Sequence, residues 1–193
     1  MLGILAGYNY KFKVTEQMNI KLLPPDPTLA ETLYRWRQDP VAAAFNPFEN
    51  LSVETLRNML STASGDFKDY EKVNSLFWFL GNEEQIIGHF NLKSINKMMF
   101  TAEIGYGIGP NHRSRGLATA AMRMATKQIF EHTPLRKLCA GVHQENLASQ
   151  RVLEKSGYIR EGILREHYLV SGKPANEVIY GLLRGEIIES EST

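Results

Sequence analysis

The feature that most restricts the fold of this chain lies at residues 103–118, which read Glu-Ile-Gly-Tyr-Gly-Ile-Gly-Pro-Asn-His-Arg-Ser-Arg-Gly-Leu-Ala. An alternating strand pattern ends there, a basic loop follows, and a helical pattern begins at Gly116. The first amides of a helix have no partners within it and carry partial positive charge. With Arg113 and Arg115 beside them, these amides predict an anion site, typically for phosphate. The competing interpretation is a helix start with two solvated arginines.

The flanking sequence predicts an α/β (α+β) fold, because strand and helix patterns both recur along the chain. The patterns at 75–80, 85–92 and 98–108 predict an antiparallel meander, and Ser171-Gly-Lys173 predicts the turn of a closing hairpin. The expected strands are 19–23, 75–80, 85–92, 98–108, 138–142, 159–170 and 178–183. The expected helices, about four in number, are 27–39, 53–62, 116–130 and 146–157.

Composition indicates one ordinary globular domain, because 43% of the residues are apolar, 22% are charged, and there is no internal repeat or linker. We assign the domain to residues 18–188. Residues 1–17 form an N-terminal extension, either an extra strand or a tail, and 189–193 a C-terminal tail. The apolar run at 1–7 is too short to span a bilayer and follows no basic residues, so neither a membrane helix nor a signal peptide is expected.

Charge and cysteine content exclude several classes of function. The net charge of +1, without runs of like charge, argues against a broad nucleic-acid surface. The only cysteine, Cys139, rules out an internal disulfide and fits a cytoplasmic protein. It lies in an apolar strand, so we do not expect a nucleophile. The five histidines lack paired spacing, and no metal is expected.

The motif Arg113-Ser-Arg-Gly-Leu-Ala118 matches the pattern [QR]-x-x-G-x-[GA] of the GCN5-related N-acetyltransferases, the GNAT superfamily. Other phosphate motifs fit poorly, because a Walker loop is absent and Gly105-Tyr-Gly-Ile-Gly109 lacks the dinucleotide spacing. Three further segments resemble the RimJ/RimL branch, which acetylates ribosomal-protein N-termini: 35–40, 146–158 and 161–165. The resemblance covers roughly residues 18–185.

The resemblance implies the GNAT fold, a mixed and mostly antiparallel sheet in which the fourth and fifth strands run parallel but splay apart. It also implies acetyl-CoA as co-substrate, with loop amides holding the pyrophosphate and the pantetheine arm entering the gap. The asparagine that begins the 146–157 helix resembles a family contact to this arm, although its residue type is equally that of a helix N-cap. The implied coenzyme-binding residues are Ile108, Arg113, Arg115, Gly116, Leu117, Ala118, Thr119 and Asn146.

The implied reaction is direct attack of a neutral amine on the thioester, with a carboxylate as base and a hydroxyl as acid. Glu103, on the strand that would line the acetyl group, is the first candidate for the base. Ser149, which faces the same side of its helix as Asn146, is the candidate for protonating the thiolate. The runners-up are Glu161 and Glu166 as bases and Tyr158 and Tyr168 as acids, each with an ordinary structural interpretation beside the catalytic one.

The acceptor is expected to be a protein or peptide N-terminal α-amine. The alternatives are a small amine, such as an antibiotic or polyamine, and a non-catalytic acyl-CoA sensor. The first two helices, the loop at 63–74 and the closing hairpin are expected to form the acceptor side. Relatives often carry an aspartate shortly before the last strand, where Asn176-Glu177 stands here, so the acceptor's identity stays open. Both a monomer and a homodimer are compatible with the pattern.

Overall fold

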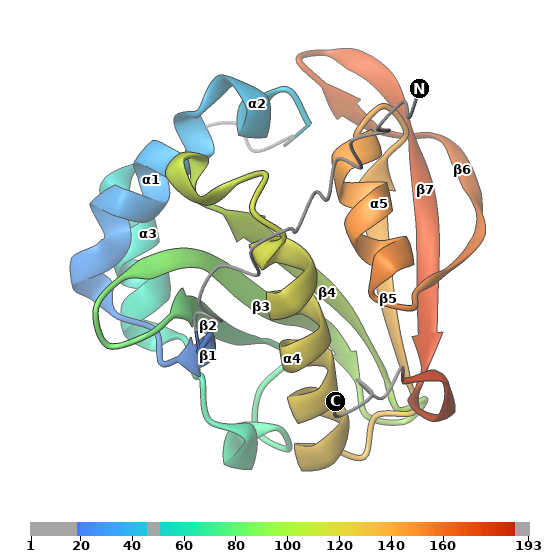
Figure 1. Cartoon of the computed structure of the whole chain (residues 1–193), viewed down its shortest axis with the longest axis horizontal. Coiled ribbons are helices and arrows are strands. Elements are labelled where there is room, and N and C mark those ends of the chain that lie inside the picture. The colour runs from blue at the N-terminus through green and yellow to red at the C-terminus, as the bar shows by residue number, and fades with distance from the viewer. Residues whose placement is uncertain (1–18, 46–50, 188–193) are drawn as a thin grey trace, which may run out of the picture.

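The computed structural model describes residues 19–45 and 51–187. Its seven strands form one sheet in the order β1-β2-β3-β4-β5-β7-β6 (Figure 1). Every neighbouring pair is antiparallel except β4 and β5, which are parallel. The strands are β1 (Lys21–Leu23), β2 (Leu76–Gly81), β3 (Ile86–Asn96), β4 (Thr101–Ile108), β5 (Lys137–His143), β6 (Ile159–Val170) and β7 (Lys173–Leu183). The predicted extension 1–17 and tail 189–193 lie outside the described residues.

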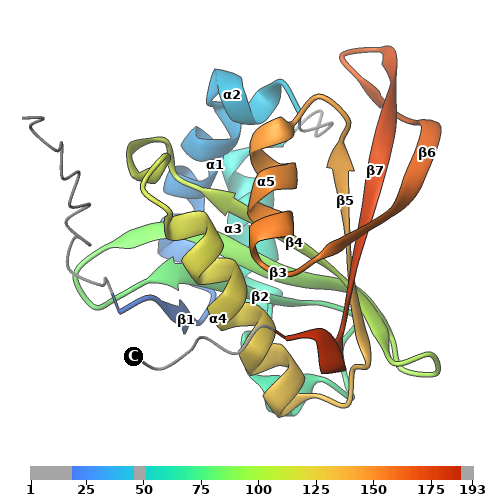
Figure 2. The same ribbon diagram turned by 45° about the vertical axis from the view of Figure 1, so that its right-hand side comes forward.

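Helices cover both faces of the sheet (Figure 2). One face packs against α4 (Leu117–His132) and α5 (Leu147–Lys155) and holds the larger apolar core. On the other face, α1 (Ala30–Gln38) and α3 (Val53–Thr62) pack on Phe77 and Phe79 of β2. The short helix α2 (Pro40–Ala43) follows α1 directly. We call these two sides the α4 face and the α1 face.

The parallel pairing of β4 with β5 is short, and it leaves a gap in the middle of the sheet. Only Thr101, Ala102 and Glu103 of β4 pair with β5, at Lys137, Leu138 and Cys139. Beyond these positions β4 stays paired with β3, and β5 stays paired with β7. The two strands therefore separate toward their carboxyl ends, which confirms the splayed strands four and five.

Two helix ends are fixed by capping residues next to them in the sequence. The Ser52 hydroxyl accepts from the Thr55 amide and caps α3. At the end of α5, Gly157 has φ +93°, and the amides of Gly157 and Tyr158 donate to the carbonyls of Glu154 and Leu153. This is a Schellman ending, which places a glycine in the left-handed region.

The structure corrects three predicted boundaries. Residues 97–100 form a turn rather than the start of β4, because the Asn96 side chain accepts from the Met99 amide and closes the turn. The last strand begins at Lys173, not at residue 178, since Ser171 and Gly172 both have positive φ and form a tight hairpin turn. Pro40 starts a further helix, α2, so that five α-helices lie within the described residues instead of about four.

The paired base of the gap should be the part of the sheet most sensitive to core truncation. Leu138 lies opposite Ala102, and its side chain is 0% exposed. We predict that Leu138→Ala lowers the free energy of unfolding by about 3 kcal/mol, because the cavity left in this core cannot fully collapse. Urea denaturation measures the change. Leu147→Ala, at a residue 57% exposed, is the matched control and should change stability by less than about 0.5 kcal/mol.

Candidate active site

The basic turn before α4 has the geometry of an anion site. Gly116, the N-cap of α4, has φ +75°, and Ser114 has φ +61°. Among the described residues, no side chain caps the helix at Gly116, so its first amides, from Leu117 to Thr119, stay available. A Cβ placed on Gly116 would meet no atom within 4 Å, which shows that the space beside the turn is open. The turn can therefore accept a phosphate group, as the sequence predicts.

The two arginines of the turn differ in their surroundings. Arg115 is exposed, and no ion pair or hydrogen bond of its side chain occurs within the part of the chain that the structure describes. Arg113 instead donates to both carboxylate oxygens of Asp39, at 2.8 and 2.9 Å, and to the Ile108 carbonyl at 3.2 Å. Only Arg115 thus has its charge free for a ligand.

Two hydroxyl groups meet on the α4 face beside the gap. Tyr106 of β4 and Ser149 of α5 lie 2.9 Å apart between their hydroxyl oxygens. Burial raises the pKa of Tyr106 to about 12, so its hydroxyl keeps its proton near neutral pH. Sequence reasoning selected Ser149. It missed Tyr106 as a partner, because only the packing of α5 against β4 brings the two hydroxyls together.

Asn146 caps α5 in the structure. Its side-chain oxygen accepts from the Ser149 amide at 3.1 Å. The side-chain amino group makes no hydrogen bond within the described ranges, so it can still donate to a ligand in the gap. The structural interpretation of Asn146 is therefore correct, and it leaves the binding role possible at the same time.

The opposite side of the gap, on the α1 face, carries a carboxylate that the sequence analysis did not select. Glu177 of β7 pairs with His143 of β5, and its carboxylate lies where a Cβ of Gly141 would stand. The Glu177 side chain is only 16% exposed, and its oxygen lies 3.4 Å from His167. Burial raises the pKa of Glu177, and His167 offsets part of this rise. Glu177 combines the position and the raised pKa of a general base. The only sequence signal was Asn176-Glu177 in place of the family aspartate.

Glu103 lies lower on the same face, where β4 and β5 are still paired. Its backbone is opposite Cys139, and its carboxylate forms an ion pair with Lys93 at 2.6 Å. The ammonium group competes with any substrate proton for this carboxylate. Glu103 therefore lies near the gap, but its negative charge is neutralised by Lys93 on the neighbouring strand.

The remaining candidates occupy structural positions or the outer strand. Tyr158 is buried and lies 3.0 Å from the Thr126 hydroxyl, as expected for a core residue. Glu161 accepts from Lys137 at 2.6 Å, and Glu166 is exposed on β6. Tyr168 lies on the α1 face, with its ring 5.9 Å from that of His143. Tyr168 is therefore on the side of the sheet away from Ser149.

Two residues of β3 complete the α1 face beside β4. Asn91 lies over Gly105 and His89 lies over Gly107, so that a Cβ at either glycine would overlap the neighbouring side chain. Burial lowers the pKa of His89 to about 3, so this ring is neutral. Together they form the wall of the gap opposite Glu177.

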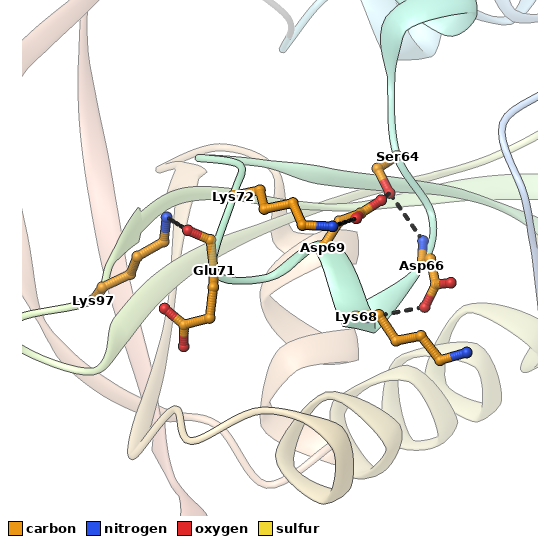
Figure 3. A network of polar contacts seen from close by, with 7 residues as sticks. All are labelled: Ser64, Asp66, Lys68, Asp69, Glu71, Lys72 and Lys97. Atoms are coloured by element: carbon orange, nitrogen blue, oxygen red, sulfur yellow. Dashed lines mark hydrogen bonds and ion pairs between the residues drawn. The ribbon is translucent and has the colours of Figure 1, made fainter.

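The loop at 63–74 is not part of this site. Phe67 stacks on His132 at the carboxyl end of α4, while the basic turn lies at its amino end, about 24 Å away along 16 residues. Figure 3 shows Asp69 in contact with other residues of the same loop. Its carboxylate accepts a hydrogen bond from Ser64 at 2.8 Å and forms an ion pair with Lys72 at 3.1 Å. The expectation that this loop lines the acceptor side is wrong.

Comparison with known proteins identifies the family. A family model described as an acetyltransferase (GNAT) domain matches residues 19–159. This chain belongs to the GNAT acetyltransferase family. It is 30% identical over 179 residues to the putative ribosomal N-acetyltransferase YdaF of Bacillus subtilis, covering 90% of this chain and 95% of YdaF.

Two further similarities agree with this assignment. The chain is 36% identical over 95 residues to the probable N-acetyltransferase YjcK of Bacillus subtilis, covering 49% of this chain and 52% of YjcK, so that the match spans about half of that relative. Mycobacterium smegmatis RimJ in complex with CoA-disulfide has the same fold, with a TM-score of 0.76 at 21% identity over 89% of this chain and 85% of that chain. The likeness to YdaF places the chain in the RimJ/RimL-like branch, and the RimJ structure shows that the two proteins share a fold.

As a member of the GNAT family, the protein is an N-acetyltransferase that takes its acetyl group from acetyl-CoA. The open turn, the uncapped α4 and the gap beside Tyr106 fit this co-substrate. Within the described residues, no group of three or more His, Cys, Asp and Glu side chains could hold a metal ion. Every helix in that part of the chain is too short or too polar to span a bilayer.

We predict that Gly116→Glu removes measurable acetyl-CoA binding, because the new side chain fills the open space and repels phosphate. Gly116→Ala is the control, since it carries the same strained φ of +75° but no charge. The alanine variant should lose about 1–2 kcal/mol of stability and retain most of its affinity for the coenzyme. Calorimetric titration of both variants measures this difference. Unchanged affinity of the glutamate variant would show that the phosphate site lies elsewhere.

Proposed function

We propose that the acceptor is the α-amine of a protein or peptide N-terminus and that acetyl transfer takes place across the gap between β4 and β5. The name of YdaF, a putative ribosomal N-acetyltransferase, supports a protein acceptor. The reaction is placed in the cytoplasm, which fits a chain with one cysteine.

The coenzyme is assigned to the α4 face. The first amides of α4 and the free Arg115 side chain hold the diphosphate, and Gly116 lets them approach it closely. Ile108, at the open end of β4, and the free amino group of Asn146 contact the arm that enters the gap. Acetyl-CoA supplies the acetyl group as a thioester. This arrangement puts the sulfur on the side of the Tyr106–Ser149 hydroxyl pair.

The observation that carries the proposal is the placement of acid and base on opposite faces of one gap. Glu177 on the α1 face takes one proton of the ammonium group, directly or through one water, and passes it to solvent, so that the neutral nitrogen attacks the carbonyl carbon. The second proton that this nitrogen must lose to become an amide leaves by the same carboxylate as the C–N bond forms. As the C–N bond forms and the C–S bond breaks, Ser149 gives its proton to the thiolate. Tyr106, 2.9 Å away, hydrogen-bonds Ser149 and relays to it a replacement proton from solvent, so that both hydroxyls are protonated again at the end of the cycle.

One weakly basic carboxylate is suited to an α-amine. An α-amine has a pKa near 7.7–8.0, so roughly one molecule in ten is neutral at pH 7. A lysine side chain, with a pKa near 10.4, is neutral in only about one molecule in 2,500. Deprotonation by Glu177 is therefore much less unfavourable for an N-terminal amine than for a lysine side chain.

The charges of the α1 face argue against a polyamine acceptor. Glu103 and Glu161 are each paired with a lysine, at 2.6 Å in both cases. Asp66 and Asp69 lie in the loop at 63–74, which is remote from the gap. Since a polyamine carries several positive charges, it needs more uncompensated negative charge than Glu177 provides.

We predict that the enzyme acetylates peptides that begin with Ser, Ala or Met and leaves spermidine and an N-terminally blocked lysine peptide nearly unmodified. Thiol release from acetyl-CoA measures the rates, and mass spectrometry locates the acetyl group. Preferred acetylation of spermidine would overturn the α-amine assignment but keep the transferase. Tight coenzyme binding without turnover on any amine would instead support the sensor.

The two candidate bases can be separated by isosteric substitution. We predict that Glu177→Gln lowers kcat by about 100-fold, the usual contribution of a positioned base, with little change in acetyl-CoA affinity. Because burial raises the pKa of Glu177, the wild-type rate should begin to fall with decreasing pH above the usual range for glutamate, and this limb should be absent in the variant. Glu103→Gln is the control and should retain most activity. The reverse result would make Glu103 the base.

A further inference from the structure

Arg113 belongs to the motif of the basic turn, but its side chain points toward the acceptor side of the molecule. One guanidinium nitrogen donates to both oxygens of Asp39, at 2.8 and 2.9 Å, and Nε donates to the Ile108 carbonyl at 3.2 Å. The Arg113 and Asp39 side chains are 30% and 12% exposed. Hydrogen bonds between two charged groups are stronger than those between neutral groups. The positive charge of Arg113 is thus already matched.

Asp39 is the junction between α1 and α2. Besides accepting from Arg113, its carboxylate accepts from the Val41 amide at 3.2 Å and caps α2. Trp36, one turn earlier, packs against Gly109 so closely that a Cβ there would overlap the indole. The helix junction is therefore docked on the end of β4 at two points, Gly109 and Arg113.

The segment that starts at Asp39 also reaches the other side of the gap. The ring of Phe45, two residues after α2, lies 5.3 Å from the ring of His143 at the end of β5. Figures 1 and 2 both show α2 above the end of the sheet toward which β4 and β5 separate. Residues 39–45 thus form a bridge over the mouth of the gap, anchored by Arg113 at one end and by His143 at the other. We call this segment the α2 bridge.

We infer that Arg113 is a positioning residue for the acceptor rather than a ligand of the coenzyme diphosphate. It holds the α2 bridge over the acceptor side of the gap, and Arg115 with the amides of α4 meets the diphosphate. This inference uses the acetyltransferase activity of the family and holds for any amine acceptor.

The alternative, in which the Arg113 side chain turns to bind phosphate, has a clear electrostatic penalty. Hydrogen bonds from Arg113 hold the pKa of Asp39 below its usual range, so the carboxylate is ionised at neutral pH. If Arg113 left, this mostly buried carboxylate would keep only the backbone amides of Val41 and Ala42 near it, and a charge without a counterion there is strongly unfavourable. The contact is therefore maintained when the coenzyme binds, and Arg115 is the residue free to move.

Arg113→Gln and Arg115→Gln form a matched pair for the test, because they remove the same charge two residues apart. Titration calorimetry measures the Kd of acetyl-CoA, and steady-state kinetics at saturating acetyl-CoA measures the KM of the amine that the wild-type enzyme acetylates fastest. For Arg113→Gln we expect the acceptor KM to rise about tenfold and the coenzyme Kd to stay within about twofold. For Arg115→Gln we expect the coenzyme Kd to rise about tenfold and the acceptor KM to stay within about twofold. A tenfold change corresponds to the loss of one charged hydrogen bond.

Asp39→Asn tests the same link from its partner. Asparagine has the same shape and can still cap α2, so the helix remains while the ion pair is lost. This variant should match Arg113→Gln in acceptor KM, and the double variant should be no worse than either single one, as for two residues that act together. Arg113→Lys, which restores one charged contact to Asp39, should recover part of the acceptor KM.

Two results would overturn the inference. One is a loss of coenzyme affinity in Arg113→Gln equal to that in Arg115→Gln. The other is an unchanged acceptor KM in Asp39→Asn, a variant that decides the question even if Arg113→Gln does not fold. Because the acceptor is chosen as the best wild-type substrate, both results can be distinguished from failure of the α-amine proposal.

Discussion

The structure depends on the early end of the pairing between β4 and β5. Three residue pairs join the strands, and beyond Glu103 and Cys139 the edges that face each other are unpaired. Backbone amides and carbonyls in the interior of a protein need hydrogen-bond partners, and an unpaired edge supplies a row of them. The gap is thus a preformed receptor for an extended ligand that can hydrogen-bond like a strand. Its depth is set by the pair of Glu103 and Cys139, the last one that joins the two strands.

The gap also divides the chemistry between two faces. Side chains alternate along a strand, so neighbouring positions of β4 present Tyr106 to α5 and Gly105 or Gly107 to the α1 face. The glycines leave room for Asn91 and His89, and Gly141 leaves room for Glu177 in the same way. In the proposed reaction, the carboxylate that takes protons from the amine and the hydroxyl pair that gives one to the thiolate therefore lie on opposite sides of the gap. This separation lets one carboxylate stay ionised while the hydroxyl pair stays protonated.

Most of the fold and half of the site could be predicted from the sequence, because these parts depend on local patterns. Period-two and helical patterns located the strands and the longer helices. The basic turn was located from its glycine and arginines at the start of a helical pattern, and Gly116 is the N-cap of α4. The hairpin turn at 171–172, the cap at Ser52 and the ending at Gly157 are likewise local. The GNAT resemblance added the splay, which no local pattern shows.

The rest depends on contacts between distant residues. Glu177 becomes a candidate base only because the register of β7 on β5 places it beside the gap. Glu103 loses this role because it is paired with a lysine on the neighbouring strand. Arg113 looks like a phosphate ligand in the motif, but its partner Asp39 lies 74 residues earlier. A sequence motif shows that a residue is charged, but it does not show which distant residue carries the compensating charge. In the arrangement that we propose, this compensation assigns the roles: the paired Arg113 holds the α2 bridge, the free Arg115 binds the coenzyme, and Glu177, which has no lysine partner within the described residues, serves the amine.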